Sequence, residues 1–137
     1  MIRYTDSIEN ITPAMLSGFF DGWSNPPSRQ THLKILANSE FVVLAIDDSN
    51  GKVIGFINAI SDSVLFAHIS LFEVLPEYRN KGIGTELAKR MLAKLKQFYA
   101  VSLMCDEGLQ SFYTRLGMSP GLGMYIWNYE RQSGKEV

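Results

Sequence analysis

The stretch VLPEYRNKGIGTELAKRML, residues 74–92, decides the fold because it joins a strand to a helix through a basic turn with two glycines. Its first residues continue a long apolar run that ends at Pro76, whose missing amide donor favours a strand end there. Beyond the turn, apolar side chains recur every four positions, at Ile83, Leu87, Met91 and Leu95. This period predicts the strongest amphipathic helix in the chain.

The turn itself fits two interpretations. In the first, unpaired amides at a helix N-terminus bind a phosphate, and Gly82 and Gly84 leave room for it. Arg79 and Lys81 add positive charge, and Thr85 adds a hydroxyl donor. In the second, the glycines merely allow positive φ in a basic surface turn. The apolar strand before the turn, the amphipathic helix after it and the two cations favour the phosphate cradle.

Two better-known phosphate motifs do not fit the turn. No lysine followed by serine or threonine comes after the glycines, which argues against a nucleotide triphosphatase loop. Leu87 stands where a dinucleotide fingerprint has its third glycine. A different phosphate ligand is therefore expected.

On both sides of this stretch, apolar runs separated by Pro, Gly and polar turn residues predict the remaining helices and strands. We expect strands at residues 2–4, 41–46, 53–60, 64–74, 99–105 and 124–129. We expect helices at residues 13–20, 29–38, from 82 onward and at 109–116. The turn DDSNG at residues 47–51 predicts a hairpin, so the middle strands form an antiparallel meander. The element order is typical of a mixed α+β architecture.

Length and composition exclude several classes of protein. The 137 residues, 46% of them hydrophobic, predict a single domain over residues 1–137. The net charge of -1 argues against a nucleic-acid partner. No apolar run is long enough to cross a bilayer, so we expect a cytoplasmic protein without a membrane segment. The single cysteine, Cys105, has no companion for a disulfide or a metal site, and no metal is expected.

Two motifs together resemble the GCN5-related N-acetyltransferase (GNAT) family. RNKGIG at residues 79–84 fits the signature Q/R-x-x-G-x-G/A, and VLPEY at 74–78 fits its usual lead-in. DEGLQSFYTRLGM at 106–118 is similar to the second hallmark, a helix that carries Phe-Tyr and ends in Leu-Gly. The resemblance implies a central, mostly antiparallel twisted sheet of about six to seven strands, with a splayed strand pair and about four flanking helices.

The resemblance also implies acetyl-CoA as co-substrate. Its pyrophosphate would lie on the glycine turn, and its pantetheine arm would pair with free backbone groups of the strand before the turn. The second motif opens with Asp106 where the family usually has asparagine. The implied contacts are Val74, Leu75, Arg79, Asn80, Lys81, Gly82, Ile83, Gly84, Thr85, Asp106 and Phe112.

Catalytic roles are implied for two residues. Tyr113 aligns with the tyrosine that the family uses as general acid toward the departing thiolate; the alternative is an aromatic in a core-facing helix. Glu73 is the leading general base, with His68 behind it. The alternatives are a solvent-facing strand residue for Glu73 and a half-buried imidazole for His68.

The expected acceptor pocket involves aromatic side chains in irregular segments. Trp23 either forms a wall of this pocket or caps the core, and Tyr125 and Trp127 invite the same two interpretations. The predicted function is an N-acetyltransferase, an acyltransferase that moves acetyl from acetyl-CoA directly to a primary amine. The alternative is a non-catalytic acyl-CoA-binding or sensing module. The expected partners are a small-molecule or peptide amine and, as one option, a second copy in a homodimer.

Overall fold

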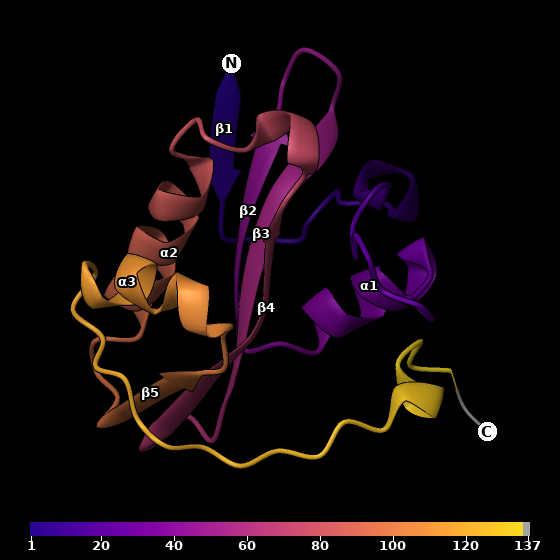
Figure 1. Cartoon of the computed structure of the whole chain (residues 1–137). Helices are drawn as coiled ribbons and strands as arrows, with labels where there is room; N and C mark the ends of the chain where they lie inside the picture. Colours follow the sequence, from indigo (N-terminus) through magenta and orange to yellow (C-terminus); the bar gives the residue numbers. More distant parts are fainter. Residues whose placement is uncertain (136–137) are drawn as a thin grey trace.

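The computed structural model describes residues 1–135, built around one five-stranded sheet in the order β1-β2-β3-β4-β5 (Figure 1). The strands are β1 (Ile2–Thr5), β2 (Phe41–Asp47), β3 (Lys52–Ser61), β4 (Phe66–Val74) and β5 (Ala100–Leu103). The α-helices are α1 (Arg29–Ala37), α2 (Ile83–Lys94) and α3 (Gln110–Thr114). Single-turn 3-10 helices are η1 (Pro13–Leu16), η2 (Pro76–Tyr78), η3 (Glu107–Leu109) and η4 (Tyr129–Arg131).

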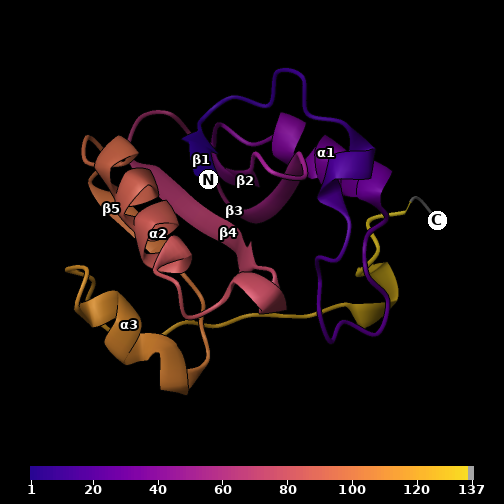
Figure 2. The ribbon, with the colours of Figure 1, turned by 90° about the horizontal axis from the view of Figure 1, so that it is seen from above.

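Helices cover both faces of the sheet, with α2 on one side and η1 with α1 on the other (Figure 2). The central strands β2 and β3 are therefore almost continuously buried and apolar rather than alternating. On the α2 side, Ile57, Leu87 and Met91 belong to one buried cluster. On the other side, Leu36 and Phe56 belong to a second one. The predicted amphipathic helix thus packs as its apolar period requires.

Strands β1 to β4 form the predicted antiparallel meander. Strands β4 and β5 are instead parallel, and they pair only from Phe66 to Ile69 and from Ala100 to Leu103. Beyond this short ladder, residues 71–74 of β4 remain paired with β3 but have no neighbour on the β5 side. The splayed strand pair that the family resemblance implies is present.

Three expectations need correction. The helix expected at residues 13–20 is only the single turn η1, because Ser17 is already extended (φ -80°, ψ 148°) and the left-handed backbone at Gly18 (φ 92°) and Phe20 (φ 67°) keeps the helix from resuming. The strand expected at residues 124–129 pairs with no strand of the described chain. The sheet therefore has five strands rather than six to seven, and three α-helices rather than about four flank it. Within residues 1–135, no helix combines the length and apolar character needed to span a membrane.

Candidate functional site

The unpaired end of β4 presents backbone groups to the open side of the sheet. The Leu75 amide donates to the Ile54 carbonyl at 2.9 Å, so these two residues form a hydrogen-bonded pair. Because such pairs alternate along an antiparallel ladder, the backbone N–H and C=O of Glu73 also face β3. Those of Phe72 and Val74 face outward. The Leu75 amide is thus not available to a ligand. The Val74 amide is the donor nearest to the following turn.

The glycine turn presents a run of unpartnered amides. Gly82 is the N-cap of α2 with φ 82°, and Asn80 has φ 63°. The first helical bond runs from the Glu86 amide to the Gly82 carbonyl. Within the described chain, the amides of residues 80–85 donate to no backbone or side-chain acceptor. Six successive donors at a helix N-terminus are a strong anion-binding arrangement.

The two glycines leave open space in front of these amides. A Cβ on Gly82 would meet no protein atom within 4 Å. A Cβ on Gly84 would lie 3.6 Å from the Phe72 ring and 3.7 Å from a Val74 methyl, which are ordinary contacts. Protein packing therefore does not require glycine at 84. The bare backbone suits a ligand that lies between the turn and the outer edge of β4.

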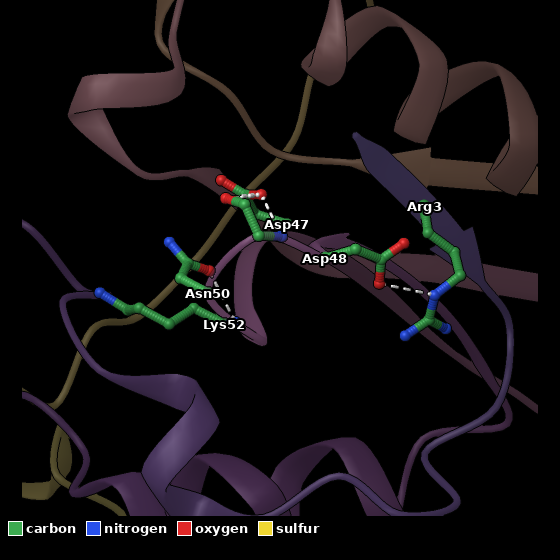
Figure 3. A network of polar contacts seen from close by, with 6 residues as sticks. Arg3, Asp47, Asp48, Asn50 and Lys52 are labelled. Carbon is green, nitrogen blue, oxygen red and sulfur yellow. Dashed lines mark hydrogen bonds and ion pairs between the residues drawn. The ribbon is translucent and has the colours of Figure 1, made fainter.

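The β2–β3 hairpin fixes the chain just before the cradle. The Tyr78 hydroxyl donates to an Asp47 carboxylate oxygen at 2.6 Å. Hydrogen bonds from Ser49 and then Tyr78 lower the pKa of Asp47 to about 2, so the carboxylate stays charged near neutral pH. Asn50 shapes the same turn by accepting the Lys52 amide at 2.9 Å (Figure 3). Because Tyr78 ends η2, this network sets where the cradle begins.

The two cations of the turn have protein contacts of their own. Arg79 Nε donates to the Val74 carbonyl at 2.9 Å, and its guanidinium lies 3.8 Å from Asp21. The Lys81 ammonium lies 5.6 Å from the centre of the Tyr78 ring. Arg79 therefore satisfies the outward carbonyl of Val74, and the Val74 amide is the outward backbone group that stays free.

Glu73 holds the loop that follows η1. One carboxylate oxygen accepts the Phe20 amide at 2.8 Å, and the other accepts the Asp21 amide at 3.3 Å. The side chain lines a cavity of about 200 Å³ together with Trp23 and Phe72. These bonds support the left-handed backbone at Phe20 and so position Trp23, three residues later.

Tyr113 approaches from the opposite side, on α3. Its ring packs edge-on against Phe112 at 5.0 Å between centres, and Phe112 packs against Phe72 of β4 at 6.3 Å. Burial, with a smaller effect of the Cys105 thiol, raises the pKa of Tyr113 to about 12. The phenol is thus a protonated donor throughout the neutral range. It lines a cavity of about 450 Å³ that also contains Asp106.

The Glu73 and Tyr113 cavities form one cleft over the outer edge of β4, because they share Trp23, Leu71 and Phe72 as walls. We call it the β4 cleft. Trp23 also borders a third cavity of about 370 Å³, with Trp127 and Tyr129 from the C-terminal segment. The wall position favours the pocket interpretation of Trp23, although its ring also packs at 4.9 Å on Phe20.

The structure brings together most residues predicted for the site. Tyr113, Asp106, Glu73 and Arg79 line the cleft, and Gly84 of the cradle lies beside its wall residue Phe72. His68 is separate, because it lies in the paired half of β4 with Nδ1 2.9 Å from the Ser102 hydroxyl. The sequence reasoning missed Phe72, which a period of two along the strand from Val74 places on the same edge.

No group of three or more His, Cys, Asp or Glu side chains among residues 1–135 is arranged to hold a metal ion.

Comparisons with known proteins agree with this geometry. The family model described as Acetyltransferase (GNAT) family matches residues 8–118. The uncharacterized N-acetyltransferase ycf52 of Pyropia yezoensis is 28% identical over 120 residues, which are 83% of this chain and 68% of that protein. A ycf52-like N-acetyltransferase of Prochlorococcus marinus is 35% identical over 100 residues, 70% of this chain and 55% of that one.

Solved structures extend the likeness to nearly the whole chain. A crystal structure from Deinococcus radiodurans R1, provisionally described as an acetyltransferase, is 42% identical with a TM-score of 0.94, over 99% of this chain and 94% of that one. A GNAT-family acetyltransferase from Streptococcus pneumoniae TIGR4 is 26% identical with a TM-score of 0.71, over 93% of this chain and 98% of that one.

Proposed function

The chain belongs to the GNAT family of acetyltransferases, and we propose that it transfers the acetyl group of acetyl-CoA directly to a primary amine. The observation that carries this proposal is the continuity of two features in one stretch of chain. The outward Val74 amide on the free edge of β4 leads into the unpartnered amides of residues 80–85. One feature suits a strand-like amide chain and the other suits a pyrophosphate.

The residues present fit acetyl-CoA. Its thioester supplies an activated acetyl group, which is what acyl transfer to an amine requires. The amides and the Thr85 hydroxyl bind the pyrophosphate, with Arg79 and Lys81 adding charge. Gly82 and Gly84 keep the approach open, and Val74 donates to the thioester carbonyl. Asp106 and Phe112 border the path toward Tyr113.

Tyr113 acts on the leaving sulfur as a hydrogen-bond donor. Its raised pKa keeps it protonated, but full transfer of its proton to a sulfur with a thiol-like pKa of about 8.5 is uphill by about 5 kcal/mol. The hydroxyl therefore stabilises the developing negative charge, and solvent supplies the proton that completes the thiol. Removing one such donor costs about a hundredfold in kcat.

Glu73 is the base in this scheme. An alkylammonium with pKa about 10.4 is neutral in roughly one molecule in a few thousand at pH 7, which costs about 4–5 kcal/mol. A carboxylate at the cleft wall accepts the proton that the amine loses. The Phe20 and Asp21 amides hold Glu73 in place, and each oxygen has a second lone pair for the amine or a bridging water.

The acceptor is an amine on a small molecule or a peptide, and the aromatic wall at Trp23 suits its apolar part. We infer no nucleic-acid partner, in keeping with the net charge of -1, and a cytoplasmic location. No metal takes part in the scheme.

The test measures thiol release from acetyl-CoA with a panel of primary amines. Wild-type protein is expected to turn over at least one amine, Tyr113→Phe to lower kcat about a hundredfold, and Glu73→Gln to shift the pH optimum upward. Matched controls are Tyr99→Phe, which changes a tyrosine that is 84% exposed, and Glu77→Gln on η2. Saturable acetyl-CoA binding without turnover of any amine would leave the non-catalytic acyl-CoA-binding module as the function.

A further inference from the structure

A β-bulge changes the direction of one serine side chain in β4. Asn58 of β3 pairs with Leu71, but the next residue, Ala59, pairs with Ile69, so Ser70 is the extra residue of the bulge. Ile69 packs in the core on the α2 side of the sheet, whereas Leu71 packs on the α1 side. In a regular strand these two residues would share a face, because side chains alternate with a period of two. The alternation is therefore reset at Ser70.

A buried amide fixes the direction of the Ser70 hydroxyl. Asn58 is 1% exposed, and its Nδ2 donates to Ser70 Oγ and to Ser39 Oγ, both at 2.9 Å. Ser39 follows α1 and gives its own proton to the Ile35 carbonyl at 2.8 Å, so it can only accept from Asn58. This chain of bonds determines which end of the amide faces the two serines. Ser70 is therefore an acceptor toward Asn58 and keeps its single proton for another partner.

The unused proton of Ser70 belongs to the β4 cleft. β5 pairs with β4 only as far as Ile69, so Ser70 is the first residue beyond the point where the sheet opens. Ser70 is exposed and lines the larger cavity of the cleft together with Tyr113 and Trp127. Within residues 1–135, its hydroxyl donates to no acceptor. The oxygen of the Asn58 amide is buried without a partner, a cost that favours a role for this side chain beyond stability.

Glu73 lies on the same side of β4, because its pairing partner Phe56 belongs to the buried cluster on the α1 side. The three residues from Ser70 to Glu73 span about 10 Å in a regular strand, and the bulge shortens this span. Leu71 and Trp23 lie between the two ends, since both residues line both cavities of the cleft. The cleft thus presents, in order, a carboxylate, an apolar wall and a hydroxyl donor.

The charges of the cleft restrict what this hydroxyl can bind. Glu73, Asp21 and Asp106 line the two cavities. The only cation that lines them within the described chain is Arg79, whose guanidinium lies 3.8 Å from Asp21. An anionic group at Ser70 would therefore meet a net negative surface. An uncharged oxygen accepts the Ser70 proton without that repulsion.

We propose that Ser70 is a specificity-determining residue, and that Asn58 positions its hydroxyl to donate to an uncharged oxygen of the acceptor. The acceptor class is a primary amine that carries an ether, carbonyl or hydroxyl oxygen several bonds from its nitrogen, across an apolar spacer. The nitrogen lies at Glu73, the spacer lies on Leu71 and Trp23, and the oxygen lies at Ser70. The identity of this ligand as the acetyl acceptor rests on the proposed function.

The test measures binding and therefore does not require turnover. The chain has two tryptophans, Trp23 and Trp127, and both line the β4 cleft, so intrinsic fluorescence reports on ligands there. The probes are ω-methoxyalkylamines with about four to seven methylenes, each paired with the alkylamine in which a methylene replaces the oxygen. Titrations are run with and without CoA. Wild-type protein is expected to bind at least one ether more tightly than its paired alkylamine.

Ser70→Ala is expected to lower the ratio of these two affinities roughly five- to tenfold, whereas Ser70→Thr keeps the hydroxyl and the ratio. Ser111→Ala is the matched control, because Ser111 is an exposed serine of α3 that lines neither cavity of the cleft. A ratio of two affinities in one protein does not depend on the fraction that is folded. A ratio that Ser70→Ala leaves unchanged, or no binding of any of these amines, overturns the proposal.

Thiol release from acetyl-CoA with the same amines separates this inference from the proposed function. Discrimination that depends on Ser70 without acetylation of the bound ethers would support the Ser70 subsite and remove acetyl transfer. Acetylation with a preference that Ser70→Ala does not change would do the reverse. An ω-aminocarboxylate of matched length that binds more tightly than the ether would overturn the assignment to an uncharged oxygen.

Discussion

Replacing Gly84 with alanine separates ligand binding from folding. A methyl group there meets Phe72 at 3.6 Å and Val74 at 3.7 Å, so it fits without displacing protein atoms. It also removes a glycine from the first turn of α2, which is worth up to about 0.5–1 kcal/mol of helix stability. We therefore expect the unliganded Gly84→Ala protein to melt at the wild-type temperature or slightly above it.

The same methyl occupies the space between the cradle and the outer edge of β4. Overpacking a filled site costs about 1–3 kcal/mol, so we expect the Kd for acetyl-CoA to rise roughly ten- to a hundredfold. Calorimetric titration measures the Kd, and a thermal melt with and without ligand measures stability. Gly82→Ala is the companion variant, because φ 82° costs alanine about 1–2 kcal/mol even without ligand. Wild-type acetyl-CoA affinity in Gly84→Ala would refute the placement of the cofactor.

Three further predictions concern stability. Burial lowers the pKa of His32 from 6.5 to about 4, so the unfolded chain takes up a proton before the folded one, and the free energy of unfolding falls by roughly 3 kcal/mol between neutral pH and pH 4. Urea titrations at several pH values should show this loss in wild-type protein and not in His32→Leu. An equal loss in both proteins would contradict the prediction. Ser28→Ala should cost about 1 kcal/mol in urea unfolding, because the Ser28 hydroxyl accepts the Thr31 amide at the start of α1. Gly55→Ala should cost about 1–3 kcal/mol, since its Cβ would lie 2.9 Å from a Leu87 methyl; an unchanged melting temperature would mean that Leu87 moves aside freely.

The stretch that would hold the cofactor in the proposed site was predictable as local structure, because it is contiguous in sequence. One stretch contains the strand end, the glycine turn and α2, and each is specified by neighbouring residues. The Ser28 cap and the turn at residues 47–51 were predictable for the same reason. Errors arose where a backbone conformation depends on distant partners. Phe20, whose left-handed backbone keeps a helix from reaching residue 20, is held by Glu73, 53 residues away.

The C-terminal segment at residues 119–127 shows the opposite limit of sequence reasoning. Its alternating apolar residues correctly indicate an extended segment, since Tyr125 and Trp127 share one side and Met124 and Ile126 the other. The apolar period and the strand propensity of these residues indicate which side chains a strand could bury, but they do not identify the strand with which it would pair. The expected sixth strand is therefore missing from the sheet although its residues are those of a strand.

Glu73 links the two halves of the proposed site. Its backbone belongs to the strand that leads into the cradle, and its carboxylate holds the loop that carries Trp23. A base placed in this way moves with the strand that presents the acetyl donor, and the acceptor wall moves with the base. In this scheme, changes elsewhere in the loop or in residues 119–127 can alter the acceptor while the cofactor geometry stays fixed. This separation explains why the proposed cofactor-binding half can be recognised in one stretch of sequence, whereas the acceptor wall is assembled from three distant segments of the chain.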